Sequence, residues 1–292
     1  MKDLVIGSIT NYNFEDIRNW VVSLEQSGFV GHKLMMVYDN DYSVVHELNR
    51  RDFSIFAFGQ DENTQRFTYP KKDFNIVVDR FYNTWRFLNE LDSRDSDNIR
   101  NVILTDVKDV IFQKNPSEFF NLPQNSETKL FASSEGITYE HEIWGNQNMR
   151  LSFPWIYPQM KDKLIYNAGV IAGRLETVKD LCLAIYNMIA YAPAHIPGGG
   201  GPDQAAYNIL LTQEPFRSAT KFLQHNDGWA AQLGTTADPN KFDVYRKHLY
   251  GGIPIIENGV VYTEADVPFI VVHQYNRVPD LNRIVNERYK NG

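Results

Sequence analysis

Short apolar runs alternate with amphipathic stretches along the first sixty residues of this chain. The runs Leu4–Ile9, Lys33–Tyr38 and Phe53–Phe58 have the length and composition of buried strands. Between them, Phe14–Gln26 has helical spacing of its apolar residues, and a second helical segment is expected around Val44–Asn49. Because parallel strands need a crossover connection that is usually a helix, this alternation predicts an α/β protein with a mainly parallel sheet.

Similar patterns continue without a convincing linker, so the 292 residues are expected to form a single domain. The segment Glu135–Pro158 is aromatic and is expected to be irregular. The other predicted elements are helices at Phe74–Leu91, Leu175–Tyr191 and Pro202–Leu211, and strands at Lys129–Ser133, Ile165–Ala172 and Phe269–Val272.

An acidic cluster lies between two apolar runs in Val102–Pro116. Residues 102–104 and 110–112 are predicted strands, and the break between them contains Asp106 and Asp109. Ligands of open α/β sheets bind at the carboxyl ends of strands, where carboxylates can hold a divalent cation. Residues three apart in one strand face opposite sides, so the chain must bend after Asp106 for both carboxylates to converge. Asp109 is the predicted metal ligand, and turn chemistry alone is the alternative.

Two further segments combine small residues with polar side chains. In Tyr166–Val170, Asn167 precedes small residues that allow close approach, and its amide can both donate to and accept from a hydroxyl-rich substrate. The run Gly198–Gly201, a candidate lid, precedes Asp203 and Gln204 at a predicted helix start. The alternatives are a hydrogen-bonded structural asparagine and a surface loop in which Asp203 only starts the helix.

His273 follows the predicted strand Phe269–Val272 and precedes Arg277, a candidate anion-binding residue. A single histidine is often structural. Together with Asp106 and Asp109, however, it would complete a ligand set for Mn²⁺ or Mg²⁺, because carboxylates suit both ions and imidazole is acceptable to manganese.

Composition restricts the classes of partner and site. The net charge of -7 argues against broad contact with nucleic acid, which favours a clustered basic surface. The single cysteine, Cys182, excludes an internal disulfide and a Cys-based zinc cluster, and its apolar helical setting predicts a core thiol. The N-terminus lacks a signal-peptide pattern, and no run approaches the roughly 18 apolar residues of a membrane span. A cytoplasmic protein without an integral membrane segment is therefore expected.

Several segments, taken in order, resemble the nucleotide-diphospho-sugar glycosyltransferases of the GT-A fold. They are the strand-helix start, Arg80 ahead of the acids, VILTDVKDVIFQKNP, YNAGVIAG, GPDQAAYN and VVHQYNR. Their order resembles the glycogenin-like, family 8-like branch, in which an acidic metal motif, an Asn-Ala-Gly strand, an Asp-Gln helix start and a C-terminal His recur. The resemblance covers about residues 4 to 277. It implies a Rossmann-like mixed sheet flanked by helices, with a nucleotide-binding half at about 1–115 and a sugar- and acceptor-binding half at about 116–292.

The acids depart from the family pattern, which is usually Asp-x-Asp. Aligning VIFQKNP with the strand after the family motif places Asp109 on the metal-binding second Asp and Val107 on the first. Asp106 is then displaced by one residue, and the metal, the ribose and the donor sugar are its alternative partners.

The resemblance also implies roles for the other polar residues. Breaking a glycosyl-phosphate bond leaves a nucleoside diphosphate whose charge needs stabilising, and a cation held by Asp109, His273 and Asp106 would supply this. Further positive charge would come from Arg80, Lys108 and Arg277. The implied nucleoside pocket is Thr10, Asn11 and Asp39, and the implied contacts to the transferred sugar or its anomeric carbon are Asn167, Asp203 and Gln204.

The stereochemical course does not follow from the residues. The glycogenin-like order favours retention, whereas Asp203 placed as a general base toward an acceptor hydroxyl would give inversion. The aromatic residues Trp144, Trp155 and Tyr157 are either an acceptor platform or a core cluster.

The expected function is metal-dependent transfer of a hexosyl or pentosyl group, in glycan biosynthesis, from a nucleotide sugar to a glycan or other hydroxyl acceptor. A UDP-sugar is the expected donor. A non-catalytic nucleotide-sugar-binding protein is one alternative, because of the atypical acidic spacing. A haloacid-dehalogenase-type phosphohydrolase needs a second Asp where this chain has Lys108, and a sugar nucleotidyltransferase needs a Gly-rich, Arg-containing loop that Ser8–Asn13 does not provide. The donor sugar, acceptor, linkage and oligomeric state do not follow from the sequence.

Overall fold

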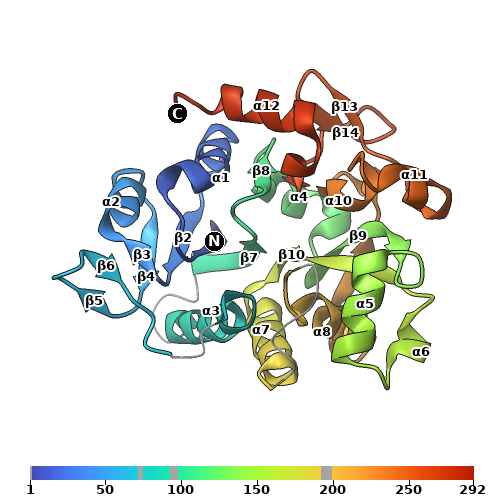
Figure 1. Ribbon diagram of the computed structural model, residues 1–292, viewed down its shortest axis with the longest axis horizontal. Coiled ribbons are helices and arrows are strands. Elements are labelled where there is room, and N and C mark those ends of the chain that lie inside the picture. Colours follow the sequence, from blue (N-terminus) through green and yellow to red (C-terminus); the bar gives the residue numbers. More distant parts are fainter. Residues whose placement is uncertain (1, 72–74, 93–97, 192–198) are drawn as a thin grey trace.

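A mixed seven-stranded sheet forms the centre of the computed structural model, which describes residues 2–71, 75–92, 98–191 and 199–292 (Figure 1). The strand order is β11-β9-β10-β7-β1-β2-β4. Six of these strands point in one direction, and β10 runs antiparallel to its neighbours β7 and β9. The strands are β1 (Lys2–Ile9), β2 (His32–Val37), β4 (Ser54–Ala57), β7 (Ile99–Thr105), β9 (Leu130–Thr138), β10 (Leu164–Arg174) and β11 (Thr220–Leu223). The predicted mixed, mainly parallel sheet is confirmed.

Helices cover both faces of this sheet because its strands are apolar on both sides. Along β1, Leu4 and Ile6 belong to one hydrophobic cluster, whereas Val5 and Ile9 belong to another. Figure 1 shows the two groups of helices that supply the partners for these clusters. The first cluster includes residues of α3 (Ile76–Asp92), α5 (Ile143–Ser152), α7 (Leu175–Ile189) and α8 (Asp203–Leu210), and the second includes residues of α1 (Phe14–Gln26), α2 (Tyr42–Arg50) and α4 (Pro116–Asn121).

Smaller sheets and short helices complete the described chain. The sheet β12-β15-β8 joins β12 (Ala230–Gln232), β15 (Val271–His273) and β8 (Val110–Phe112). The other small sheets contain β3 (Asn40–Asp41), β5 (Gln60–Asp61) and β6 (Arg66–Phe67), and β13 (Ile255–Glu257) with β14 (Val260–Tyr262). The remaining helices and turns are α6 (Tyr157–Met160), α9 (Phe216–Ala219), α10 (Leu233–Thr236), α11 (Phe242–Tyr245), α12 (Pro279–Arg288), η2 (Pro123–Asn125), η3 (His225–Asp227), η4 (Arg246–His248) and η5 (Tyr275–Arg277).

The chain changes sheets immediately after Asp106. β7 ends at Thr105, whose hydroxyl accepts a hydrogen bond from the Trp20 indole at 2.8 Å. The next backbone amide, of Asp106, donates to the carbonyl of Gly169 on β10 at 2.8 Å. The chain then turns into β8, which pairs antiparallel with β15 so that Val110 lies opposite His273. This pairing brings the late part of the chain to the end of β7.

The prediction of an irregular segment at Glu135–Pro158 is wrong. β9 extends through Glu135 to Thr138, and α5 follows. The sequence pattern does not reveal this part of the strand, because several of its buried residues are polar. In addition, Gly136 has a φ of +69°, which interrupts the regular alternation of side chains between the two faces. α5 begins where the side chain of Glu142 accepts from the amide of Gly145.

Other predicted elements agree with the structure within a few residues. The predicted helix Phe14–Gln26 is α1, and Cys182 is a free, fully buried thiol on α7 whose pKa burial raises to about 12, as expected of a core residue. The predicted helix that began at Phe74 starts outside the described residues, and α3 is described from Ile76. Among the described residues, none of the helices combines the length and apolar character that a membrane span requires.

A glycine fixes the contact between β9 and β10. A Cβ atom on Gly173 would lie 2.3 Å from the carbonyl oxygen of Lys129 and 3.0 Å from the Cα of Leu130, so backbone would have to move. Gly173→Ala should lower the free energy of unfolding by about 3 kcal/mol. Urea denaturation measures this, with Gly28→Ala as the control. Gly28 has open space around it but a φ of +78°, so strain of about 1 kcal/mol is expected there. Equal losses in the two variants would contradict the steric argument.

His225 makes the native state sensitive to acid. Its Nε2 accepts the backbone N–H of Gln232 at 3.3 Å, and burial lowers the pKa of its ring to about 4 from the ordinary 6.5. The unfolded chain therefore binds this proton more readily, and its contribution lowers stability as the pH falls below 6.5. Between pH 7 and pH 5 the loss should be about 2 kcal/mol in the free energy of unfolding. Urea titrations at both pH values test this, and His225→Gln should show a smaller pH dependence by that amount.

Candidate functional site

Two carboxylates and an imidazole converge at the end of β7. One ligand atom from each of Asp106, Asp109 and His273 can be chosen so that all three atoms lie within 4.8 Å of one another. The Nε2 of His273 is 3.6 Å from Oδ2 of Asp106 and 3.7 Å from Oδ1 of Asp109. The group lines a polar cavity of about 430 Å³. The bend that the sequence required after Asp106 is therefore present.

The imidazole of His273 is oriented by a partner behind it. Its Nδ1 lies 2.7 Å from Oε1 of Gln232, which can only accept, so Nδ1 carries a proton and Nε2 is the ring nitrogen that faces the acids. The backbone supports this arrangement, because the amide of Gln274 donates to the carbonyl of Asp109 at 2.7 Å. Gln274 takes a left-handed conformation with a φ of +60° to do so.

Electrostatics also favour a cation at this group. Burial lowers the pKa of the His273 imidazole, but the carboxylates of Asp109 and Asp106 outweigh burial and raise that pKa. Burial, together with the charge of Asp106, raises the pKa of Asp109. The raised pKa values of His273 and Asp109 mean that the site favours bound positive charge. A divalent ion in place of a proton would supply that charge.

Arg80 links the metal group (Asp106, Asp109 and His273) to α8. Its guanidinium donates to Asp106 and, from Nη2, to Oδ2 of Asp203 at 3.0 Å. Against the effect of burial, this arginine holds the pKa of Asp106 well below its usual range. Asp203, which the sequence offered as a general base, is therefore engaged by a cation inside the cavity.

A wide bulge in β10 brings backbone and amide groups to the acids. Tyr166 pairs with Ser134 and Ile171 with Ala132, so four residues of β10 lie opposite one residue of β9. A Cβ on Gly169, within this bulge, would lie 2.7 Å from both Oδ2 of Asp106 and Cε1 of His273. Glycine is thus what lets the strand pass so close to the metal group.

Both amides that the sequence singled out point toward one carboxyl group that it missed. The Nδ2 of Asn167 donates to Oε1 of Glu135 at 2.7 Å, and Gln204 is a second hydrogen-bond partner of Glu135. All three residues line the cavity. Sequence reasoning had placed Glu135 in an irregular segment, and the glycine that follows it was the available sign of a strand distortion.

Further lining residues were also missed. Glu142 accepts from the hydroxyl of Tyr245 at 2.8 Å and from the amide of Gly145. Lys241 adds a positive charge to the wall. The Trp144 indole, a predicted platform residue, donates to the carbonyl of Gly199 at 3.1 Å at the edge of the cavity.

Some predicted residues lie outside the described cavity lining. Thr10, Asn11 and Asp39 follow β1 and β2, where the amide of Asn11 donates to the carbonyl of Asp39 at 2.6 Å. Lys108 pairs with Asp16 at 3.3 Å.

The aromatic candidates are dispersed as well. Trp155 is 74% exposed, and Tyr157 accepts from the side chain of Asn146 at 2.7 Å; neither belongs to the described cavity lining. Arg277 does line the cavity, beyond His273.

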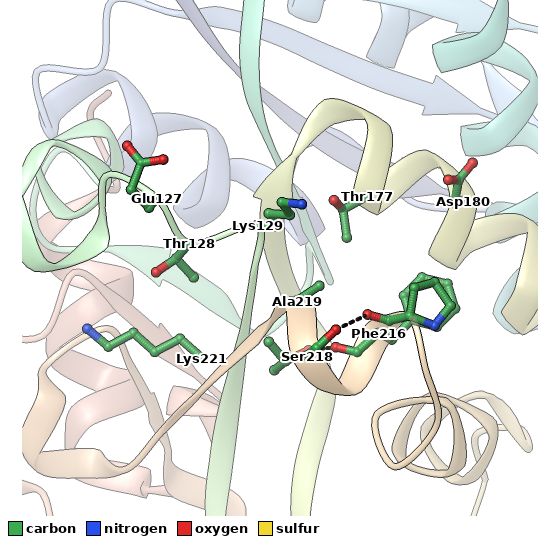
Figure 2. A pocket seen from close by; sticks show the side chains of 11 residues that line it. Glu127, Thr128, Lys129, Thr177, Asp180, Phe216, Ser218, Ala219 and Lys221 are labelled. Atoms are coloured by element: carbon green, nitrogen blue, oxygen red, sulfur yellow. Dashed lines mark hydrogen bonds between the residues drawn. The ribbon is translucent and has the colours of Figure 1, made fainter.

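A larger hollow of about 600 Å³ lies at the amino ends of β9 and β11 (Figure 2). Its described lining includes Lys129, Asp180 and Lys221 but none of the residues predicted for the site. In Figure 2, the hydroxyl of Ser218, on the short helix α9, donates a hydrogen bond to the backbone carbonyl of Pro215. Size alone does not identify the functional site, because the acid-histidine group and the convergent amides are all in the smaller cavity.

Comparison with known proteins yields a similarity of fold. No family model matches the sequence, and no curated protein matches it. Among solved structures, the chain is similar to the apo structure of WbbM, a bifunctional glycosyltransferase, with 12% identity and a TM-score of 0.57. The alignment covers 99% of this chain and 50% of that one, so this chain spans about half the length of that protein. The chain therefore has an α/β fold that matches a GT-A-like glycosyltransferase, with a possible acidic metal site at Asp106, Asp109 and His273.

Proposed function

We propose that this chain is a single-domain, metal-dependent glycosyltransferase that moves a sugar from a nucleotide-diphosphate sugar to a hydroxyl acceptor. A UDP-sugar is the proposed donor, and a glycan or another hydroxyl compound is the proposed acceptor. The observation that carries the proposal is the convergence of Asp106, Asp109 and His273 in a polar cavity at the carboxyl end of β7. In open α/β sheets, this is the end at which ligands bind.

The donor set fits Mn²⁺ or Mg²⁺. Carboxylate oxygens are preferred by both ions, and a neutral imidazole nitrogen is acceptable to manganese. His273 is held in the tautomer that leaves Nε2 free to bind by its contact with Gln232. Three protein ligands leave coordination positions for phosphate oxygens. A bound cation would neutralise the charge that develops on the diphosphate as the glycosyl-phosphate bond breaks.

The protein groups around the metal group have complementary roles. Arg277 lines the cavity and has no ion pair among the described residues, so its guanidinium is available for the diphosphate. Arg80 holds Asp106 in place. We assign the nucleoside to Thr10, Asn11 and Asp39 at the ends of β1 and β2, within the half formed by about residues 1–115.

The transferred sugar and the acceptor are assigned to the half formed by about residues 116–292. Asn167, Asp203 and Gln204 lie beside the metal group and present the polar contacts that sugar hydroxyls need. The half-exposed indole of Trp144, on the same cavity, offers an apolar face to a sugar ring.

Thermal unfolding tests the proposal directly. UDP-, GDP- and CMP-sugars are compared with and without Mn²⁺, and one nucleotide class is expected to raise the melting temperature only with the metal. At a hundredfold excess over the dissociation constant, the stabilisation is about 2.7 kcal/mol, which corresponds to about 5 °C for a chain of this size.

Asp109→Asn should abolish the metal-dependent shift, because it replaces a charged ligand with a neutral one. Asp180→Asn is the matched control, since Asp180 is exposed and lines the other hollow. A metal-dependent shift that survives in Asp109→Asn would remove the metal assignment. Binding in the wild type without transfer or donor hydrolysis would favour a non-catalytic nucleotide-sugar-binding protein.

A further inference from the structure

The side chain of Glu135 is a buried carboxyl group that forms part of the cavity wall. It is only 6% exposed, yet it lines the same cavity as the metal group. Its hydrogen bonds come from the neutral amides of Asn167 and Gln204. A carboxyl group taken out of water and bonded only to neutral amides is costly to keep as an anion, so its presence needs an explanation.

The backbone of β9 is distorted at this residue and the distortion is held by several partners. The amide of Gly136 bonds to the hydroxyl of Ser134 at 2.9 Å rather than continuing the ladder. The carbonyl of Glu135 accepts from Thr235 at 2.7 Å, and that of Gly136 accepts from the amide of Tyr250 at 2.7 Å. Distortions of this kind re-aim side chains next to functional sites.

The other acids of the described cavity lining already have a partner or a structural duty. Asp106 and Asp203 are paired with Arg80, and Asp106 also belongs to the metal group together with Asp109. Glu142 caps α5 and accepts from a tyrosine hydroxyl. Glu135 is the acid of this lining that has neither an arginine partner, nor a place in the metal group, nor a helix to cap.

We propose that Glu135 is the catalytic base of the transfer, and that the reaction is a single displacement with inversion at the anomeric carbon. This rests on the proposed function and departs from the retention that the glycogenin-like motif order favours. The acceptor oxygen forms the new bond to the anomeric carbon while the bond from that carbon to the phosphate oxygen breaks. The electron pair of the broken bond stays on the nucleoside diphosphate, and the acceptor proton passes to the carboxylate of Glu135.

The electrostatic setting of Glu135 suits a proton acceptor. Burial, with a further contribution from the charge of Glu142, raises the pKa of Glu135 to about 7. A base whose pKa is close to neutrality combines a useful ionised fraction with a strong affinity for the proton. The charge of His273 acts on Glu135, and the charge of Glu135 acts on Tyr139 and Tyr245.

Asn167 and Gln204 act in this scheme as positioning residues. Their hydrogen bonds stabilise the ionised carboxylate of Glu135 and fix its direction. Asn167 is itself fixed, because its Oδ1 accepts from the amide of Gly169 at 2.6 Å.

Hydrolysis of the nucleotide sugar, with water as the acceptor, tests the base assignment without knowledge of the natural acceptor. The donor is the one from the panel that the wild type turns over with Mn²⁺. Proton NMR of the sugar released at early times should show the anomeric configuration opposite to that of the donor. Glu135→Gln should lower the rate by about 10² to 10⁴-fold and keep the metal-dependent thermal shift.

Glu140→Gln is the matched control, because Glu140 is exposed and lies five residues further along the chain. Release of a sugar with the donor's own configuration, or an unchanged rate in Glu135→Gln, would overturn the assignment of Glu135 while leaving the proposed function standing. Absence of turnover of every donor by the wild type would instead overturn the proposed function and this inference with it.

The positioning role has a separate readout. Asn167→Ala removes a hydrogen bond that favours the ionised form of Glu135, so the acidic limb of the pH profile of kcat/KM should move to higher pH. A lower rate with an unmoved limb would show that Asn167 acts only on the fold of β10.

Discussion

A buried arginine holds together the parts from which the cavity is made. Arg80 reaches residues 26 and 123 positions away, Asp106 and Asp203, and so joins α3, the end of β7 and the start of α8. A guanidinium removed from water is tolerated only with carboxylate partners, and loss of one partner leaves a buried charge uncompensated. The direction of Asp106, and with it the metal group, therefore depends on an ion pair formed between elements that are far apart in the sequence. The bulge of β10 places Gly169 directly against Asp106, a member of this network.

Periodicity was sufficient to predict most of the central fold. The helix Phe14–Gln26 and the strands near Leu4, Lys33 and Val102 have uniform apolar faces, and each appears in the structure close to its predicted bounds. The segment from Glu135 was mispredicted because a buried strand with polar residues and a glycine at positive φ does not alternate regularly. The small sheet β12-β15-β8 also depends on contacts between distant segments, which no local pattern encodes.

The candidate site was predictable where short motifs mark it. Asp106, Asp109, Asn167, Asp203, Gln204 and His273 all line one cavity, as the resemblance implied that they would lie together. Glu135 was missed because no sequence motif marks it. Its burial and its hydrogen bond from Asn167 arise from tertiary structure. The partners of Arg80 and the orientation of His273 by Gln232 are likewise tertiary facts.

The pairing of β8 with β15 has a consequence for how the site comes into being during synthesis. Asp106 and Asp109 lie just ahead of β8, whereas His273 is the last residue of β15, so more than half of the chain lies between the acids and the histidine. A nascent chain emerging from the ribosome can complete β1, β2, β4 and β7 while the acids still have no histidine beside them. The candidate metal site is thus complete only after β15 has been made, and the two acids spend the whole intervening period of translation without the histidine.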